Sequence, residues 1–416
     1  MTGSQTTSAP AAQSAAGRRP RDPRLDIFRG LSMFIIFIAH LPGNSWTLWI
    51  PARFGFSDAT ETFVFCSGMA SSFAFASVFK NHGWWMGTAR ISHRVWQVYW
   101  AQIAVFLVIA GGLAFLNLHT DGTFDYVKQL NLHHFFNDPM PQLVGLFTLT
   151  YVPNLFDILP MYIVILALIP AVMFFARIHL LAVLAFVVGL WLLAQYRLVE
   201  FPAEPWSDRI WYFNPLGWQL VFFTGFAFGL GWLKVPALDK RLVWLCAAIV
   251  VAIIPLDFHL FHKAFPEIKA FWQSELVPVW INKTHFGLFR FIHFLATAYL
   301  AWAAFEVYGH RLMQGRTGQF FNIIRKVGQQ SLAVFLMGLV ASWFLGLALK
   351  EMGRTGLNTA LFNLLGFAIL IATAYIVSWF KGQPWRKKPE PRVSEDRTQT
   401  ETSPSALPAA KHMRDA

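Results

Sequence analysis

The chain has 416 residues, of which 56% are hydrophobic and 13% are charged, and its formal net charge is +12. Soluble globular domains contain about 25% charged residues, so this composition excludes an ordinary soluble enzyme. A basic chain would suit nucleic acid, but Lys and Arg lie mainly in short connections between apolar runs and near the two ends. That distribution indicates a protein of the lipid bilayer that contacts anionic headgroups, and it argues against nucleic acid as a partner.

The two ends of the chain differ from the rest in composition. Residues 1–20 are rich in Ala, Ser, Thr, Gln and Gly, and residues 382–416 are polar and contain several prolines. Both are predicted to be disordered tails without chemistry. Residues 21–381 are predicted to form one membrane domain. The first apolar run lacks a signal-peptide cleavage site, so we expect it to remain as the first membrane helix.

Ten apolar segments are candidates for membrane-spanning helices. Crossing a hydrocarbon core of roughly 30 Å takes about 20 mainly apolar residues. Two of the ten, 179–196 and 241–256, are short for this task. We therefore predict an all-α polytopic bundle of about ten transmembrane helices, with approximate bounds 27–41, 59–79, 96–116, 157–176, 179–196, 216–233, 241–256, 286–308, 328–349 and 357–380.

The connections between these segments predict the topology. Those on the side of the N-terminus hold roughly twice as many Lys and Arg as the others, so both termini are predicted to be cytoplasmic. On the other side, segments 117–156, 197–215 and 257–285 mix aromatic residues with Asp, Glu, Asn and His. Such mixtures suit sugars, which stack on aromatic rings and hydrogen-bond to polar groups. Interfacial re-entrant helices anchored by aromatics explain these segments equally well.

The first predicted helix carries a cation and a histidine on one face. Arg29 and His40 are 11 residues apart, which is roughly 16 Å along a helix and about 20° from the same direction. Charged residues inside the membrane are candidates for function. The alternatives are a snorkelling Arg29 paired with Asp26, and an interfacial His40 that caps the helix end.

The second predicted helix begins with two acidic residues that face the same way. Asp58 and Glu61 are three residues apart, and the short preceding connection returns them to the membrane depth of His40. A carboxylate that accepts the Nδ1 proton of a histidine fixes its tautomer and raises its basicity. His40 with Glu61 or Asp58 is therefore a candidate general-base pair. The alternative is an N-cap at Asp58 with Glu61 as a favourable first-turn acid.

Four further polar residues lie at or near the predicted membrane segments. Asp157 opens the fourth helix, Arg290 and His293 are three residues apart in the eighth, and Ser331 opens the ninth. Arg290 is a candidate for holding an anionic group. Its alternative is a structural ion pair with Asp157 or Glu61. The sequence contains no metal-ligand, nucleophile-elbow or phosphate-loop motif, so no metal site is predicted.

These motifs, in this order and spacing, resemble a known group of membrane proteins. The segment RDPRLDIFRGLSMFIIFIAH, with Arg29 and His40, is similar to the start of membrane-bound acyltransferase-3 proteins. More narrowly, SDATE, DILPMY, FNPLGWQLVFFTG and VGQQSLAVF resemble the OpgC family over roughly residues 21–380. That family is associated with succinylation of periplasmic glucans in Gram-negative bacteria. The resemblance also implies a basic residue where Gln329 or Gln330 stands.

The resemblance implies an inner-membrane O-acyltransferase that uses succinyl-CoA, or another acyl-CoA, and a glucan hydroxyl. No permanently bound cofactor is expected. His40 would be the base, oriented by Glu61 or Asp58. The expected substrate-binding residues are Arg29, Arg90, Arg94, Arg290, His293, Asp157 and Ser331, with Arg29, Arg90 and Arg94 on the CoA phosphates and Arg290 on the succinyl carboxylate.

A transporter or exporter of a glycan or organic anion is the main alternative function. It would explain a helical bundle with buried charges as well as an enzyme does. Transporters often contain internal repeats, and none is apparent between the two halves of this chain. A membrane sensor or scaffold is a third alternative, but it gives no reason for placing His40 beside Glu61.

Overall fold

A computed structural model describes residues 22–119, 124–271, 273–274 and 278–386. Within these residues the fold is helical, and strand pairing is limited to one isolated bridge between Pro202 and Ile210. The helices are α1 (Pro23–His40), α2 (Ala59–His119), α3 (His133–Asn137), α4 (Pro139–Thr148), α5 (Ile158–Ile178), α6 (Leu180–Gln195), α7 (Pro215–Leu230), α8 (Lys240–Asp257), α9 (His259–Ala264), α10 (Pro266–Phe271), α11 (Leu288–Leu312), α12 (Gly315–Gln329), α13 (Ser331–Met352) and α14 (Gly356–Gly382).

The predicted all-α fold is confirmed, and each of the ten predicted segments falls on a helix. Five helices (α2, α5, α11, α13 and α14) are long and apolar enough to cross a membrane, and α2 covers two of the ten segments. The helices α6 and α7 are apolar but shorter. Ten crossings and cytoplasmic termini stay predictions. The predicted tail 1–20 lies outside the described residues, as does most of the tail 382–416.

Two predicted connections between membrane segments are helical in the structure. Residues 80–95 continue α2, with a kink at Gly83, where φ is +81°. This conformation is accessible to glycine at no steric cost, and because it is not helical, it divides α2 into two helical parts that meet at the kink. Residues 315–329 form α12, whose apolar residues recur at helical spacing and bury Ile324 and Val327. Because both segments mix Lys, Arg and polar residues with their apolar ones, the sequence predicts connections here rather than helices.

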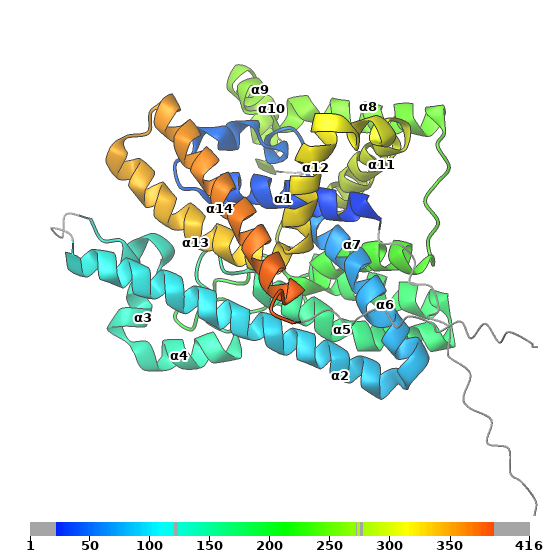
Figure 1. The fold of residues 1–416 in the computed structure, drawn as a ribbon, viewed down its shortest axis with the longest axis horizontal. Helices are drawn as coiled ribbons and strands as arrows, with labels where there is room; N and C mark the ends of the chain where they lie inside the picture. The colour runs from blue at the N-terminus through cyan, green and yellow to red at the C-terminus, as the bar shows by residue number, and fades with distance from the viewer. Residues whose placement is uncertain (1–21, 120–123, 272, 275–277, 387–416) are drawn as a thin grey trace, which may run out of the picture.

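The centre of the molecule is α1, which is packed tightly against α12 (Figure 1). A Cβ at Gly30 would collide with the Ile324 carbonyl, and one at Gly328 with the Asp26 carbonyl. A second close approach joins α2 to α7, where Gly68 faces the Phe222 carbonyl and Gly225 the Phe65 carbonyl. Small residues let helix backbones approach in this way inside membranes.

Replacing Gly328 with alanine is expected to destabilise the protein by about 1–3 kcal/mol, the usual cost of overpacking. The new methyl group would collide with main-chain atoms of Asp26 and Gly30, which cannot rotate away, so α1 and α12 must separate. A lower Tm in detergent would show this. Gly189→Ala in α6 is the matched control, because open space surrounds that position and alanine favours a helix. Equal Tm values for both variants would contradict the packing argument.

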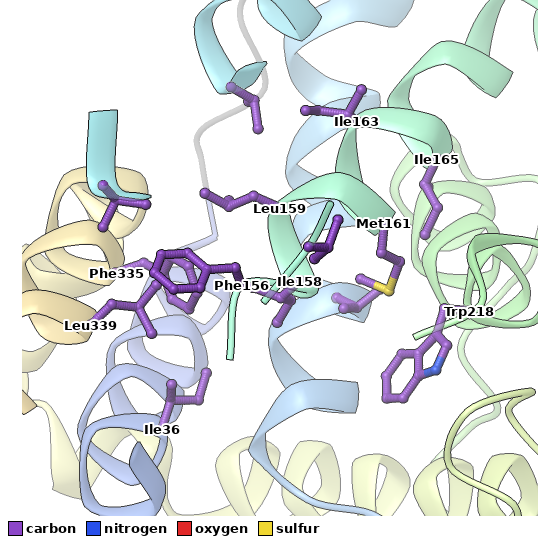
Figure 2. Packing of buried hydrophobic residues seen from close by; sticks show 14 of the residues in the cluster. Ile36, Phe156, Ile158, Leu159, Met161, Ile163, Ile165, Trp218, Phe335 and Leu339 are labelled. Carbon is purple, nitrogen blue, oxygen red and sulfur yellow. The ribbon is translucent and has the colours of Figure 1, made fainter. Parts of the chain in front are cut away.

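The apolar core lies between α1, α2, α5, α7 and α13. Figure 2 shows Ile36 of α1 and Phe335 and Leu339 of α13 near Phe156, which precedes α5. Trp218 of α7 is fully buried in the same core. This packing fixes the C-terminal half of α1 against α13 and the start of α5. His40, at the end of α1, is positioned as a result.

Candidate active site

His40 is the last residue of α1, and its ring is oriented by the main chain of the same helix. His40 Nδ1 lies 2.8 Å from the Ile36 carbonyl oxygen, which has no proton to give, so Nδ1 is the donor. In the neutral imidazole the other nitrogen, Nε2, is then the proton acceptor. His40 is half-buried and lines a cavity of about 540 Å³. This arrangement suits a general base.

The hydrogen bond that orients His40 differs from the predicted one. Glu61 or Asp58 was expected to accept the Nδ1 proton, and the Ile36 carbonyl accepts it instead. Asp58 still lines the cavity that His40 lines, and its charge favours a protonated ring through space, but the charge of its partner Lys283 opposes this more strongly. The carbonyl fixes the tautomer as a carboxylate would. Because it also accepts this hydrogen bond from a protonated ring, the Ile36 carbonyl favours the imidazolium more than Asp58 does.

Two ion pairs hold the first turn of α2 beside this cavity. Asp58 Oδ2 and Lys283 Nζ are 2.5 Å apart, and Glu61 Oε1 and Arg290 Nη1 are 2.8 Å apart. Arg290 Nη1 also donates to the Phe56 carbonyl oxygen. The sequence left Asp157 and Glu61 open as structural partners of Arg290, and in the structure the partner is Glu61. Glu61 is completely buried, so this pair is shielded from solvent.

Asp58 and Glu61 also cap α2, as the alternative interpretation expected. The Thr60 N–H donates to Asp58 Oδ1 at 2.6 Å, and the Asp58 N–H donates to Glu61 Oε2 at 2.8 Å. This reciprocal arrangement is a capping box. Burial raises the pKa of the Asp58 carboxyl, but the charges of Lys283 and Arg290 outweigh burial and hold that pKa well below its usual value. Asp58 is therefore ionised at neutral pH.

Asp157, just before α5, forms another wall of the same cavity. Its Oδ1 accepts a hydrogen bond from the Tyr212 N–H at 2.9 Å. Burial raises the pKa of Asp157 to about 6, although the Tyr212 hydrogen bond and the Arg209 charge oppose this shift. The Tyr212 side chain also lines the cavity and is 49% exposed. A carboxyl group beside an accessible aromatic ring suits a ligand with several hydroxyl groups.

A second cavity, of about 730 Å³, adjoins the first. It adds Arg53, Asp257 and Arg290 to the lining. Because the two cavities share part of their walls, we treat them as two parts of one chamber, called the His40 chamber below. The shared residues are Ala39, Ile50, Ala52, Asp58, Tyr212 and Lys283.

His293 lies outside the His40 chamber. Its Nδ1 is 2.7 Å from Ser57 Oγ and accepts the Ser57 N–H at 3.2 Å. His293 is 4% exposed and is absent from the lining of both cavities. It supports the segment that leads into α2. Substrate binding by His293, as predicted from the sequence, would therefore have to be indirect.

Several predicted donor-binding residues meet at the opposite end of α1. Arg29 Nη2 donates to Ser331 Oγ, which joins α1 to the start of α13. The neighbouring Gln330 accepts a hydrogen bond from Lys381 Nζ of α14 at 2.7 Å. Lys381 is also close enough to Arg94 of α2 for their charges to interact. A lysine from α14 thus lies beside Gln330, one of the two positions where the resemblance implied a basic residue. Arg90, in contrast, is exposed on α2.

A narrow apolar seam joins this cationic end to His40. Met33, Ile36 and Phe37 of α1 face Val334, Phe335, Gly338 and Leu339 of α13, and a small gap between them reaches His40. Arg29 and Ser331 close one end of the seam. Arg29 and His40 therefore mark the two ends of the α1–α13 contact, as their shared helix face predicted.

Two residues of interest were missed by the sequence analysis, Lys283 and Lys381. Each is a lysine in a connection or at a helix end, where its charge indicates only topology, and both come from segments distant in the chain from α1. The nearest sequence signal for Lys283 was its place in the aromatic and polar segment 257–285. In the part of the chain that the structure describes, no group of three His, Cys, Asp or Glu side chains could hold a metal ion.

A family model described as OpgC protein matches residues 21–382, which is most of the chain. No curated protein matches. No solved structure matches either. The family match covers α1 to α14, with both the His40 chamber and the cationic end of α1. The chain therefore belongs to the OpgC protein family.

Proposed function

We propose that the protein is a membrane O-acyltransferase that moves a succinyl group from succinyl-CoA to a hydroxyl group of a periplasmic glucan. Membership of the OpgC family supports a membrane acyltransferase. The observation that carries the proposal is the placement of His40. Its Nδ1 is held by the Ile36 carbonyl, and its ring borders a chamber that also contains Asp157 and Tyr212.

The proposed reaction begins with proton transfer to His40. As Nε2 takes the proton of a sugar hydroxyl, the hydroxyl oxygen attacks the carbonyl carbon of the thioester. The tetrahedral intermediate then collapses, the C–S bond breaks, and the departing CoA sulfur takes the proton from the imidazolium. The ester and free CoA are the products. Positioned general-base catalysis supplies about 10²–10⁴-fold, so alignment of the two substrates must supply much of the rest.

The donor is proposed to enter at the cationic end of α1. Arg29 contacts Ser331, and Lys381 contacts the neighbouring Gln330. Arg94 is close enough to Lys381 for their charges to interact, so three helices bring cations to this end. Arginine and lysine side chains bind phosphate through charge-assisted hydrogen bonds. The seam between α1 and α13 would open for the slender, uncharged arm of CoA. That arm would span the roughly 16 Å between Arg29 and His40, which follows from their 11-residue separation.

The acceptor is proposed to occupy the His40 chamber from the opposite side. Tyr212 offers a ring face to a pyranose, and Asp157 offers a hydrogen-bond acceptor. Both contacts leave the attacking hydroxyl free to approach His40. This division places a charged donor and a neutral acceptor at opposite ends of one helix.

Acyl transfer by purified protein in nanodiscs tests the proposal. Succinyl-CoA and a β-glucan oligosaccharide are supplied, and release of CoA is followed together with the mass of the sugar. A succinyl increment on the sugar is the expected result. Folded protein that gives no product with several glucans and acyl donors, but moves glycan across proteoliposomes without acyl-CoA, would overturn the proposal in favour of transport.

Replacing Arg94 or Lys381 with glutamine is expected to raise the KM for succinyl-CoA by about tenfold, since each removes one charged contact to phosphate. A truncated donor, the succinyl thioester of N-acetylcysteamine, lacks the nucleotide phosphates and is the internal control. Its KM should change little in either variant. A similar rise for both donors would assign these cations to the fold rather than to the donor.

A further inference from the structure

The His40 chamber contains a lysine for which the proposed reaction, as written above, has no role. Lys283 precedes α11 and lines both parts of the chamber. Its side chain is 25% exposed, and its Nζ contacts Asp58 Oδ2 at 2.5 Å. Asp58 borders the same cavity as His40, so the Lys283 ammonium belongs to the region where the acyl group would react.

The charge of Lys283 is maintained despite its enclosed position. Burial lowers the pKa of Lys283, but the charges of Asp58 and Glu61 outweigh burial and raise it above its usual value. An ammonium group has three N–H donors. Asp58 uses one, and the Phe213 ring lies 5.8 Å from Nζ and adds a weaker attraction. Further N–H donors remain for a ligand in the chamber.

Two of the other three cations of the chamber are more fully engaged by protein groups. Arg209 donates to Glu204 and to the Val152 carbonyl. Arg290 donates to Glu61 and to the Phe56 carbonyl and is largely buried. The third, Arg53, is exposed and lines only the second cavity, which His40 does not line. Lys283, which lines both cavities, is therefore the cation best placed to bind an additional anion near His40 without giving up its own partner.

We propose that Lys283 binds the terminal carboxylate of a dicarboxylic acyl group and thereby selects succinyl over uncharged acyl groups of the same length. The inference rests on the proposed function and adds the residue that determines donor specificity. It also reassigns the role predicted for Arg290 from sequence. Arg290 instead holds Glu61 and the segment before α2, while Lys283 faces the substrate.

The test compares succinyl-CoA with butyryl-CoA, which has the same number of acyl carbons but no carboxylate. The ratio of the two kcat/KM values is measured for the wild type, Lys283→Met and Lys283→Arg. We expect Lys283→Met to lower the preference for succinyl by about 10–100-fold, the usual effect of losing one charge-assisted hydrogen bond. Lys283→Arg keeps the charge and should retain part of the preference.

Lys283→Met leaves the Asp58 carboxylate without its partner, so loss of folded protein must be separated from loss of specificity. The double variant Asp58→Asn/Lys283→Met removes both charges and should fold with the same reduced preference. Arg290→Gln is the comparator and should leave the preference unchanged in whatever folded fraction remains.

Three results would overturn the assignment to Lys283. One is an equal loss with both donors in the Lys283 variants, which would indicate a structural or general electrostatic role. Another is an unchanged preference in the double variant. The third is a change of preference in Arg290→Gln alone. Inactivity of the folded wild type with both donors would instead overturn the proposed function, and this inference with it.

Discussion

Replacing His40 with alanine is expected to lower the rate of acyl transfer by about 10²–10⁴-fold, the contribution of one positioned general base. The variant lacks the group that takes the proton from the attacking hydroxyl. The His40 ring is half-buried and contacts a cavity on one side, so its removal leaves most of the core intact. Release of CoA and mass gain on the sugar measure the effect, with Tm as a check on folding.

A matched control is available on α11. His310 is exposed, contacts Gln314 at 3.1 Å, and lines neither cavity of the chamber. His310→Ala should retain the wild-type rate. Normal turnover in folded His40→Ala would remove His40 from the mechanism. A loss of activity in both variants would point to a general effect on the protein rather than to the base.

The helices could be predicted because their signal is local. Apolar runs of about 20 residues stand out against polar connections, so the ten segments coincide with helices in the structure. The signal fails where helices are charged on one face, as in α12. There the burial of Ile324 and Val327 depends on α1, which is almost 300 residues away in the chain.

The two ends of the proposed reaction path were also accessible from sequence. Arg29 and His40 lie on one face of one helix, so helical geometry alone places them along a common line. The structure adds that α13 covers this line, with Ser331 at Arg29 and Leu339 near His40. A contact between segments about 300 residues apart does not change the local sequence pattern of either segment, so it could not be predicted from that pattern.

The pairing of charges could not be predicted, because it depends on which segments meet in space. Two carboxylates three residues apart, Asp58 and Glu61, were equally plausible partners for His40. In the structure each has a cation instead, Lys283 for Asp58 and Arg290 for Glu61. Both cations come from residues 283–290, so one segment at the start of α11 supplies the positive charges that neutralise the two carboxylates beside the first turn of α2.

Replacing Arg290 with alanine is expected to destabilise the protein by about 3–5 kcal/mol, the usual effect of removing one partner of a buried ion pair. Glu61 would remain completely buried without its cation. The Phe56 carbonyl would lose a donor as well. A sharp fall in Tm, or in the yield of monodisperse protein, is the expected measurement.

The double variant Glu61→Gln/Arg290→Met separates a structural role from a catalytic one. It removes both charges while keeping similar volumes, so it should regain much of the Tm lost in Arg290→Ala. If the folded double variant also transfers acyl groups, the ion pair serves chiefly to hold α11 against the start of α2. If it folds but is inactive, the charges of the pair act on the reaction itself. A Tm for Arg290→Ala equal to that of the wild type would contradict both interpretations, because no other residue in the described structure is ion-paired with Glu61.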